Sequence, residues 1–498
     1  PAQINFALLI FLSTCTGLAI VCQLLFVLGL VNVLSPSYIA ISMLSLWLLA
    51  CMRLWMSRGQ LVLDQDWKPI SQGSLTALAF LSIGLTLTWL CVKPPGMWDD
   101  TSYHLPYASY YLHAHGISMN PWLRFPLFSH NGNLLFTLAL TWGTEIRAQV
   151  IATAIPLTLT AIGIYGICQQ FLKSRLAGWL AIVLLLGLPP IQDTLGYAYI
   201  DNLLMTFSWS AMVCMAVVLS QKSNPDSSFI LICGLLAGTA AGTKLFGAVI
   251  ATLIWGGIIL NFGLRRKHTW LYTAAIGFFG LGWYVRSYYI SGDPVHPIGG
   301  DIFGYFLWAP SDLISQQTEL ATHGSSKKPW LIIEALQKAG VLALLPTLFV
   351  VFQPRLWTRP VMALNTVVLI YLFAWQLTSQ VSRYTTTVLP AAAFLTIAWI
   401  FHAGPQDLLR KFDKWRLPLN SIGAVFLIVA SAATPYWSMQ IAKVEIEKWT
   451  ETLERRPGFK VMQAANFQKA EMGTRLVQIG YENAIYFFDG QVIGEDRK

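Results

Sequence analysis

Residues 5–31 read NFALLIFLSTCTGLAIVCQLLFVLGLV, an apolar run without a single Asp, Glu, Lys or Arg. As an α-helix, such a run is long enough to cross the hydrocarbon core of a bilayer, which takes about 20 residues. It is too long for the apolar part of a signal peptide, and no basic residue precedes it. We therefore predict a membrane helix that is retained in the protein.

The composition extends this prediction to the whole chain. Of its 498 residues, 55% are hydrophobic and only 11% are charged, and the mean hydropathy is +0.55, whereas soluble domains carry roughly a quarter charged residues. Apolar runs of spanning length recur, and they lack the alternation over about ten residues that marks an outer-membrane barrel. The predicted fold class is an all-α polytopic membrane protein.

Apolar segments of suitable length occur along most of the chain, and the last one ends near residue 437. We predict about 13 transmembrane helices. Their approximate positions are residues 5–31, 38–56, 74–92, 146–170, 176–190, 199–219, 228–242, 245–262, 269–290, 331–352, 360–379, 384–402 and 418–437.

The charges predict the orientation. The net charge is +9, but Lys and Arg form short clusters between apolar runs, which is typical of topogenic charges and argues against nucleic-acid binding. With the N-terminus in the cytoplasm, every inner loop is basic, as the positive-inside rule requires. The basic residues of these loops are Arg53, Arg58, Lys68, Lys173, Arg175, Lys222, Arg265, Arg266, Lys267, Arg355, Arg359, Arg410, Lys411, Lys414 and Arg416. The seven cysteines specify no disulfide framework.

Three larger segments then lie outside the cytoplasm. They are a first outer loop at 93–145, a second at 291–330, and a C-terminal region at 438–498 that follows a transmembrane domain at 1–437. Within the first loop, GNLLFTLALTWG at 132–143 is too short to span, so we interpret it as a juxtamembrane helix that lies at the interface or dips into it. The C-terminal region is predicted to be a small α/β unit with helices near 438–456 and 464–480, after which AIYFFDG alternates like a strand.

The first outer loop opens with PPGMWDDTSYHLPYASYYLHAHG, residues 94–116. Two adjacent carboxylates, Asp99 and Asp100, follow a span directly, and partial burial there would raise a carboxyl pKa toward the range of a general base. Side chains of adjacent helical residues diverge by about 100°, so only one of the pair can face a given reacting atom. Tyr103, Tyr107 and Tyr111 share a helix face, and we interpret them as an interfacial aromatic belt rather than a sugar-stacking platform.

Other polar residues are predicted on the same side of the membrane. Asp201 in YIDN is interpreted either as a helix cap or as a site residue. Lys244, Arg286 and Arg383 lie at outer ends of spans, where cations are costly and usually paired or functional, so the three together indicate a bound anion. For Arg286, snorkelling to the interface is an equally good interpretation.

The histidines give a weaker signal. His113 and His115 near the acidic pair fit no closed set of metal ligands, so no metal site is predicted. His104 is interpreted as a hydrogen-bonding partner for a phosphate or a sugar, and His296 lies in the second outer loop.

Five short motifs occur in this order over most of residues 90–402: WDDTSYHLP just after a span, YIDN, AAGTK, GWYVRSYYISGDPVHP and SRYTTTVLP. Together they resemble the GT-C fold glycosyltransferases that use polyprenyl-phosphate sugars, including protein O-mannosyltransferase and aminoarabinose transferase relatives. The resemblance implies an inverting transfer of a hexosyl or pentosyl unit from an undecaprenyl- or dolichyl-phosphate carrier to a lipid, glycan or protein acceptor outside the cytoplasm. It places the chain in the bacterial inner membrane, as a cell-envelope enzyme.

The same resemblance assigns roles to residues. Asp99 or Asp100 would be the general base. Carrier or sugar binding would involve Lys244, Arg286, Arg383, Tyr384 and His104, and Asp201 would shape the site. No cofactor and no divalent metal are expected besides the lipid-linked donor.

The sequence departs from the family pattern at three points. Two spans precede the one that leads into the acidic loop, where many relatives have a single span. An Asp-Asp pair replaces the Asp-Glu pair of many relatives, which leaves the identity of the base open. The C-terminal region is much smaller than the soluble domains of oligosaccharyltransferases, which disfavours transfer of a whole oligosaccharide.

Two other functions compete with the enzyme. A non-catalytic GT-C-like subunit of a larger membrane complex would not need its acidic loop and outer cations to meet. A secondary transporter would show inverted repeats and broken helices with polar residues at mid-bilayer, and the sequence contains no such repeat. The sequence does not identify the sugar, the acceptor or the oligomeric state.

Overall fold

The computed structural model describes residues 4–56, 70–221, 225–304, 306, 311, 314, 318, 340–378, 381–403, 449–455, 458–472, 475–478, 482–489 and 491–494. Within these ranges, seven helices are long and apolar enough to cross a membrane, and three further apolar helices are shorter. The chain is an integral membrane protein of the predicted all-α class. The predicted number of about 13 spans is not confirmed, and the span predicted at 418–437 lies outside the described residues.

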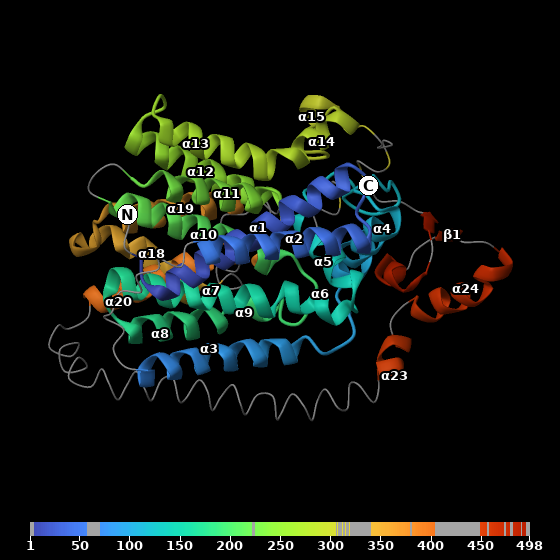
Figure 1. Cartoon of the computed structure of the whole chain (residues 1–498), viewed down its shortest axis with the longest axis horizontal. Helices are drawn as coiled ribbons and strands as arrows, with labels where there is room; N and C mark the ends of the chain where they lie inside the picture. Colours follow the sequence, from blue (N-terminus) through green and yellow to red (C-terminus); the bar gives the residue numbers. More distant parts are fainter. Residues whose placement is uncertain are drawn as a thin grey trace.

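The long helices run side by side in one bundle (Figure 1). Their ends follow the ends of the apolar runs, where polar side chains cap the first turn: the Asn5 side chain accepts the N–H of Leu8 at 3.0 Å, and the Asp226 side chain accepts that of Ser228 at 2.9 Å. The helices of the bundle and its rim are α1 (Phe6–Leu30), α2 (Pro36–Met56), α3 (Ile70–Leu90), α6 (Glu145–Ala152), α7 (Ala154–Ile167), η2 (Cys168–Leu172), α8 (Arg175–Leu186), α9 (Pro189–Gln192), α10 (Asp201–Ser220), α11 (Ser227–Ala241), α12 (Leu245–Phe262), α13 (Lys267–Ile276), η3 (Gly277–Leu281), α14 (Gly282–Ser291), α15 (Gly300–Phe303), α18 (Val341–Phe349), η4 (Val350–Phe352), η5 (Pro354–Leu356), α19 (Arg359–Thr378), η6 (Ser382–Val388) and α20 (Leu389–Ala403).

Helix α10 lies at the centre of the bundle. All of its residues from Asp201 to Leu219 are buried, which is the pattern of a helix surrounded by protein. It packs against α7, α11, α19 and η6. Asp201 and Ser220 are its first and last residues, so α10 connects the two ends of the bundle.

The first outer loop folds at one end of the bundle as η1 (Asp100–His104), α4 (Leu105–Ala114) and α5 (Asn131–Thr141). The helix predicted at 132–143 is present as α5, and other helices cover it. Most of its residues are buried against α1, α4 and α6. The apolar face packs into the core, and Asn131 is satisfied internally, because it accepts from Trp283 Nε1 at 2.8 Å and donates to the Thr239 carbonyl at 3.2 Å.

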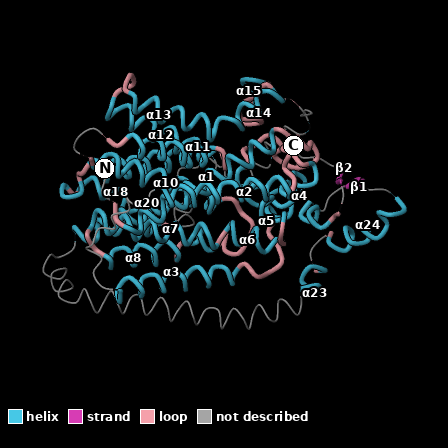
Figure 2. Tube along the Cα trace, viewed as in Figure 1, coloured by secondary structure: helices cyan, strands magenta, loops and turns pink. Residues whose placement is uncertain are grey.

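The C-terminal region contains α23 (Trp449–Glu454), α24 (Phe459–Met472), β1 (Arg475–Gln478), η7 (Glu482–Phe487) and β2 (Gln491–Gly494). The small α/β character is as predicted, and β1 and β2 pair in parallel (Figure 2). The strand predicted at AIYFFDG is wrong, because η7 covers most of this segment. The apolar residues of η7 pack on two sides: Phe487 contacts Phe459 of the tail, Tyr486 contacts the main core, and Ile485 contacts both the tail and the main core.

The tail lies at the same end of the bundle as the first outer loop (Figure 1). Helix η7 contacts η1 and α4. The C-terminal region therefore packs directly on η1, the helix that begins at Asp100.

Candidate active site

The acidic pair lies just beyond α3, where the chain turns at Pro94 and Pro95. Asp99 precedes η1 and Asp100 is its first residue. Both side chains are buried, with 4% and 0% of their surface exposed. Asp100 Oδ2 accepts the N–H of Gly96 at 3.2 Å, which ties the turn to the helix. Helix η1 is a single π-helical turn, a rare geometry that is frequent at functional sites.

Asp99 forms an ion pair with Arg383. The distance from Arg383 Nη2 to Asp99 Oδ2 is 2.6 Å. Arg383 comes from η6, which connects α19 to α20. Asp99 also accepts a hydrogen bond from the Tyr103 hydroxyl, and burial together with the Asp99 charge raises the pKa of Tyr103 well above its ordinary value.

A second ion pair joins Lys244 and Asp201. Lys244 Nζ lies 2.9 Å from Asp201 Oδ1, and Asp201 is fully buried. Asp201 occupies the first turn of α10 and does not cap that helix, whose cap residue is Ile200. The helix-cap interpretation of Asp201 is therefore wrong, and its carboxylate is turned toward the cation.

Aromatic rings connect the two ion pairs. Lys244 Nζ lies 4.0 Å from the ring centre of Tyr384, and the Arg383 guanidinium lies 5.6 Å from the same ring. Arg383 also lies 4.8 Å over the ring of Tyr199. The structure thus brings Asp99, Asp201, Lys244, Arg383 and Tyr384 together, although they come from separate parts of the chain.

His104 borders this cluster. Its Nδ1 lies 3.2 Å from Asn133 Oδ1, so Nδ1 donates and Nε2 is left as an acceptor in the neutral ring. Burial lowers the pKa of His104 to about 4, with opposing effects of Asp99 and Lys244. At neutral pH the Nε2 atom of this ring can accept a hydrogen bond from a hydroxyl group. It carries no proton that it could donate to a phosphate oxygen.

Arg286 makes its contacts elsewhere. Its Nε donates to the carbonyl of Ile117 at 3.2 Å and its Nη1 to that of Pro126 at 3.1 Å. It is buried rather than snorkelling, with 8% of its surface exposed. Arg286 therefore holds the first outer loop onto α14 and belongs to neither ion pair.

The three tyrosines of the loop are buried in protein. Tyr107 donates to the Leu123 carbonyl at 3.1 Å, and Tyr111 hydrogen-bonds His130 Nδ1 at 2.6 Å. The aromatic-belt interpretation is therefore wrong for Tyr103, Tyr107 and Tyr111, because the loop folds back over them.

The remaining histidines are dispersed. His113 Nδ1 donates to the Ser109 carbonyl at 2.8 Å on an exposed face, and His115 ends α4 in the left-handed conformation. Buried His296 lies near Asp293. Among the residues that the structure describes, no three His, Cys, Asp or Glu side chains gather as metal ligands would.

Three neighbours of the cluster were beyond the sequence argument. Asn133 orients His104, Tyr199 underlies Arg383, and Tyr486 of the tail hydrogen-bonds Glu145 close to Asp100. Burial, reinforced by the Glu145 and Asp100 charges, raises the pKa of Tyr486. Tyr199 is the first residue of the YIDN motif, whereas Asn133 and Tyr486 lie in segments for which the sequence predicts secondary structure alone.

Two proteins of Shigella flexneri match the chain. The uncharacterized protein SF2093/S2215 is 39% identical over 142 residues, which are 28% of this chain and 71% of that protein. The chain belongs to the family of SF2093/S2215. The uncharacterized protein SF2092/S2214 is 37% identical over 115 residues, 22% of this chain and 60% of that protein. A family model described as SF2091/S2213 matches residues 448–496, which is the tail that packs on η1.

Solved structures show the same fold as this member of the family. ArnT from Cupriavidus metallidurans bound to undecaprenyl phosphate aligns with a TM-score of 0.53 at 15% identity, over 84% of this chain and 85% of that chain. The apo state of ArnT gives a TM-score of 0.53 at 13% identity, with 86% of each chain covered. The predicted GT-C fold is confirmed.

Donor groups of both cations remain available for a ligand. In the described part of the chain, buried Arg383 Nε has no hydrogen-bond partner. Lys244 Nζ carries three protons and hydrogen-bonds Asp201 with one of them. An unpartnered buried guanidinium N–H is costly, and a phosphate oxygen is the kind of acceptor that would satisfy it.

Proposed function

We propose that the chain is an inverting glycosyltransferase that moves a sugar from a polyprenyl-phosphate carrier to an acceptor outside the cytoplasm. The observation that carries this proposal is the meeting of two buried carboxylate–cation pairs, Asp99 with Arg383 and Asp201 with Lys244, at one end of the bundle. The fold shared with ArnT, whose structure holds undecaprenyl phosphate, supports the choice of carrier.

The cations would bind the carrier phosphate. Arg383 Nε and the remaining Lys244 protons offer donors to its oxygens. As the bond from the anomeric carbon to the phosphate oxygen breaks, the phosphodiester becomes a monoester and gains negative charge. Preorganised cations stabilise such developing charge, and this effect is usually the largest single contribution to catalysis.

The acidic pair would divide its roles. Asp99 contacts Arg383 and so belongs to the phosphate side of the site. In an inverting displacement the acceptor oxygen attacks opposite the leaving phosphate, which disfavours a base in contact with the phosphate-binding cation. Asp100 lies near Tyr486 of the tail instead. We assign Asp100 as the base that takes the proton of the acceptor hydroxyl as its oxygen bonds to the anomeric carbon, and Asp99 as the residue that positions Arg383.

The non-catalytic subunit is the competing function. It does not require the acidic loop to meet the cations, whereas two such contacts are present. The convergence supports an enzyme.

The test uses the purified full chain in nanodiscs. The donors are undecaprenyl-phosphate sugars that carry a panel of radiolabelled hexoses and pentoses, and a total membrane extract supplies the acceptors. Release of free undecaprenyl phosphate together with label in a new product is expected. The test variant is Asp100→Asn, and the matched control is Glu451→Gln in the exposed tail. Equal release of undecaprenyl phosphate by the wild type and by Asp100→Asn would contradict Asp100 as the base. If neither protein transfers the label, the result would favour the non-catalytic subunit.

A further inference from the structure

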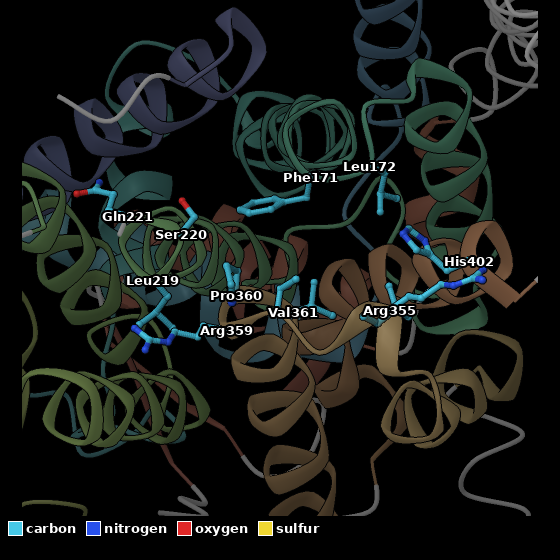
Figure 3. A pocket seen from close by; sticks show the side chains of 12 residues that line it. Phe171, Leu172, Leu219, Ser220, Gln221, Arg355, Arg359, Pro360, Val361 and His402 are labelled. Carbon is cyan, nitrogen blue, oxygen red and sulfur yellow. The ribbon is translucent and has the colours of Figure 1, made fainter. Parts of the chain in front are cut away.

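A cavity of about 490 Å³ lies where several helices of the bundle end (Figure 3). It lies between η2, the last turn of α10, η5, the first turn of α19 and the last turn of α20. The lining residues on which the site depends are Phe171, Gln221, Arg355, Arg359, Val361 and His402.

This cavity is far from the candidate active site. Asp201 begins α10 and Ser220 ends it, and a helix of this length measures about 30 Å, the thickness of the hydrocarbon core. The cavity therefore lies at the opposite membrane face. Arg355 and Arg359 belong to one of the basic loops that the charge pattern predicts to be cytoplasmic.

The lining contains two arginines and one histidine. In Figure 3, Arg355 extends toward His402, and Arg359 extends toward Leu219 on the other side of the cavity. No Asp or Glu is among the described residues that line it. His402 Nδ1 donates to the Ala398 carbonyl at 3.0 Å, so Nε2 is the ring nitrogen that remains for a ligand.

Polar donors and apolar walls are combined in the cavity. Gln221 accepts the N–H of Asp226 through Oε1, whereas its buried Nε2 has no partner within the described part of the chain. Pro360 and Val361 lie between the two arginines, and Phe171 adds a further apolar side chain to the lining (Figure 3). A small soluble anion uses only the donors, whereas a lipid headgroup uses both the donors and the apolar walls.

We propose that this cavity binds the phosphate of an anionic phospholipid from the leaflet at this face, with Arg355 and Arg359 as its cationic contacts. The apolar lining takes the glycerol and the first methylenes of the acyl chains. Cationic pockets between membrane helices on the cytoplasmic side recognise anionic headgroups in this way. The site is independent of the transfer reaction proposed above.

Native mass spectrometry of the full chain in detergent tests the proposal by counting bound lipid during titration. Phosphatidylglycerol is the anionic probe, phosphatidylcholine the zwitterionic one, and inorganic phosphate the soluble one. The first test variant is the double substitution Arg355→Gln/Arg359→Gln. The second is Val361→Trp, which fills the cavity without removing charge. The matched control is Arg265→Gln/Arg266→Gln, which removes two exposed arginines from another basic loop.

We expect phosphatidylglycerol to bind about tenfold more tightly than phosphatidylcholine. Both test variants should lose about tenfold in affinity for phosphatidylglycerol, whereas the control stays within about twofold of the wild type. Arg355 and Arg359 are exposed, so their replacement should leave the fold intact. If the double variant nevertheless fails to fold, Val361→Trp tests the site independently. Unchanged binding by both variants, or equal binding of phosphatidylcholine, would overturn the site. Inorganic phosphate binding as tightly as the lipid would overturn the lipid as its occupant.

Discussion

Arg383 Nη2 lies 2.6 Å from Asp99 Oδ2, and both side chains are largely buried, with 22% and 6% of their surfaces exposed. The pair fastens η6 to the start of η1, so the loop before α20 and the first outer loop position each other. An ion pair so shielded from water responds strongly to the loss of one partner, because the other charge stays buried. Substitution of Asp99 should therefore act through Arg383.

Asp99→Asn and Asp100→Asn should consequently have different kinetic effects. If Asp100 is the base, Asp100→Asn lowers kcat by about 10²-fold or more with little change in the donor KM. Asp99→Asn releases Arg383 and should chiefly raise the donor KM, by about tenfold. Steady-state kinetics with varied donor separates the two variants. The opposite pattern would exchange the roles of the two carboxylates.

Lys244→Met should destabilise the fold. It leaves the fully buried Asp201 without its cation, and breaking a buried pair in this way costs about 3–5 kcal/mol. Lys244→Met/Asp201→Asn removes both charges and should recover much of that loss. Lys460→Met removes an exposed pair with Glu454 and should cost less than about 1 kcal/mol. Unfolding in detergent, followed by tryptophan fluorescence, gives these values, and equal losses in Lys244→Met and Lys460→Met would contradict the buried pair.

Much of the fold could be predicted from hydropathy. The predicted span at 245–262 coincides with α12, and that at 199–219 is within two residues of α10, because polar residues bound both runs. The errors occurred in short segments. For α5 and η7, the sequence contains apolar and aromatic residues but does not reveal which neighbour covers them, so it predicts neither the burial of α5 among other helices nor the 3-10 helix that replaces the expected strand.

The site was predictable only in part. Asp99 and Asp201 lie directly beside spans, and Lys244 and Arg383 are cations at outer ends of spans, which the positive-inside rule disfavours. This charge pattern singles out all four residues. It did not show that they pair with one another. It also selected Arg286, whose partners are the carbonyls of Ile117 and Pro126. Backbone carbonyls of a loop that folds back over the bundle are not recognisable as partners from the sequence.

His104 should make stability depend on pH. Burial lowers its folded pKa to about 4, below the ordinary value of about 6.5, so the unfolded chain binds the proton first as the pH falls. Stability is full above pH 6.5 and is lost as the pH drops toward 4, by roughly 3 kcal/mol from this group. Thermal unfolding of wild type and His104→Gln between pH 7 and pH 4 checks this: the variant should have the shallower slope. Parallel slopes would mean that His104 titrates normally.

Tyr486 should affect use of the acceptor, if the proposed reaction holds. Tyr486 hydrogen-bonds Glu145, and η7 packs on η1 beside Asp100. Tyr486→Ala should raise the acceptor KM about fivefold and leave the donor KM within about twofold. Phe467→Ala is the control, since that side chain is 86% exposed on the tail. An unchanged acceptor KM would limit the tail to a structural role.

Chelation should leave the proposed transfer intact. The charge that develops on the carrier phosphate needs a positive partner, and Lys244 and Arg383 supply two such charges through protein side chains. EDTA does not remove them, so turnover after dialysis against EDTA should equal turnover with Mg²⁺ or Mn²⁺ added back. Lys244→Met in the same assay should lose activity that neither EDTA nor metal changes. Loss of wild-type turnover on chelation, with recovery on adding metal, would show that the two side chains do not suffice and that a divalent cation shares the phosphate.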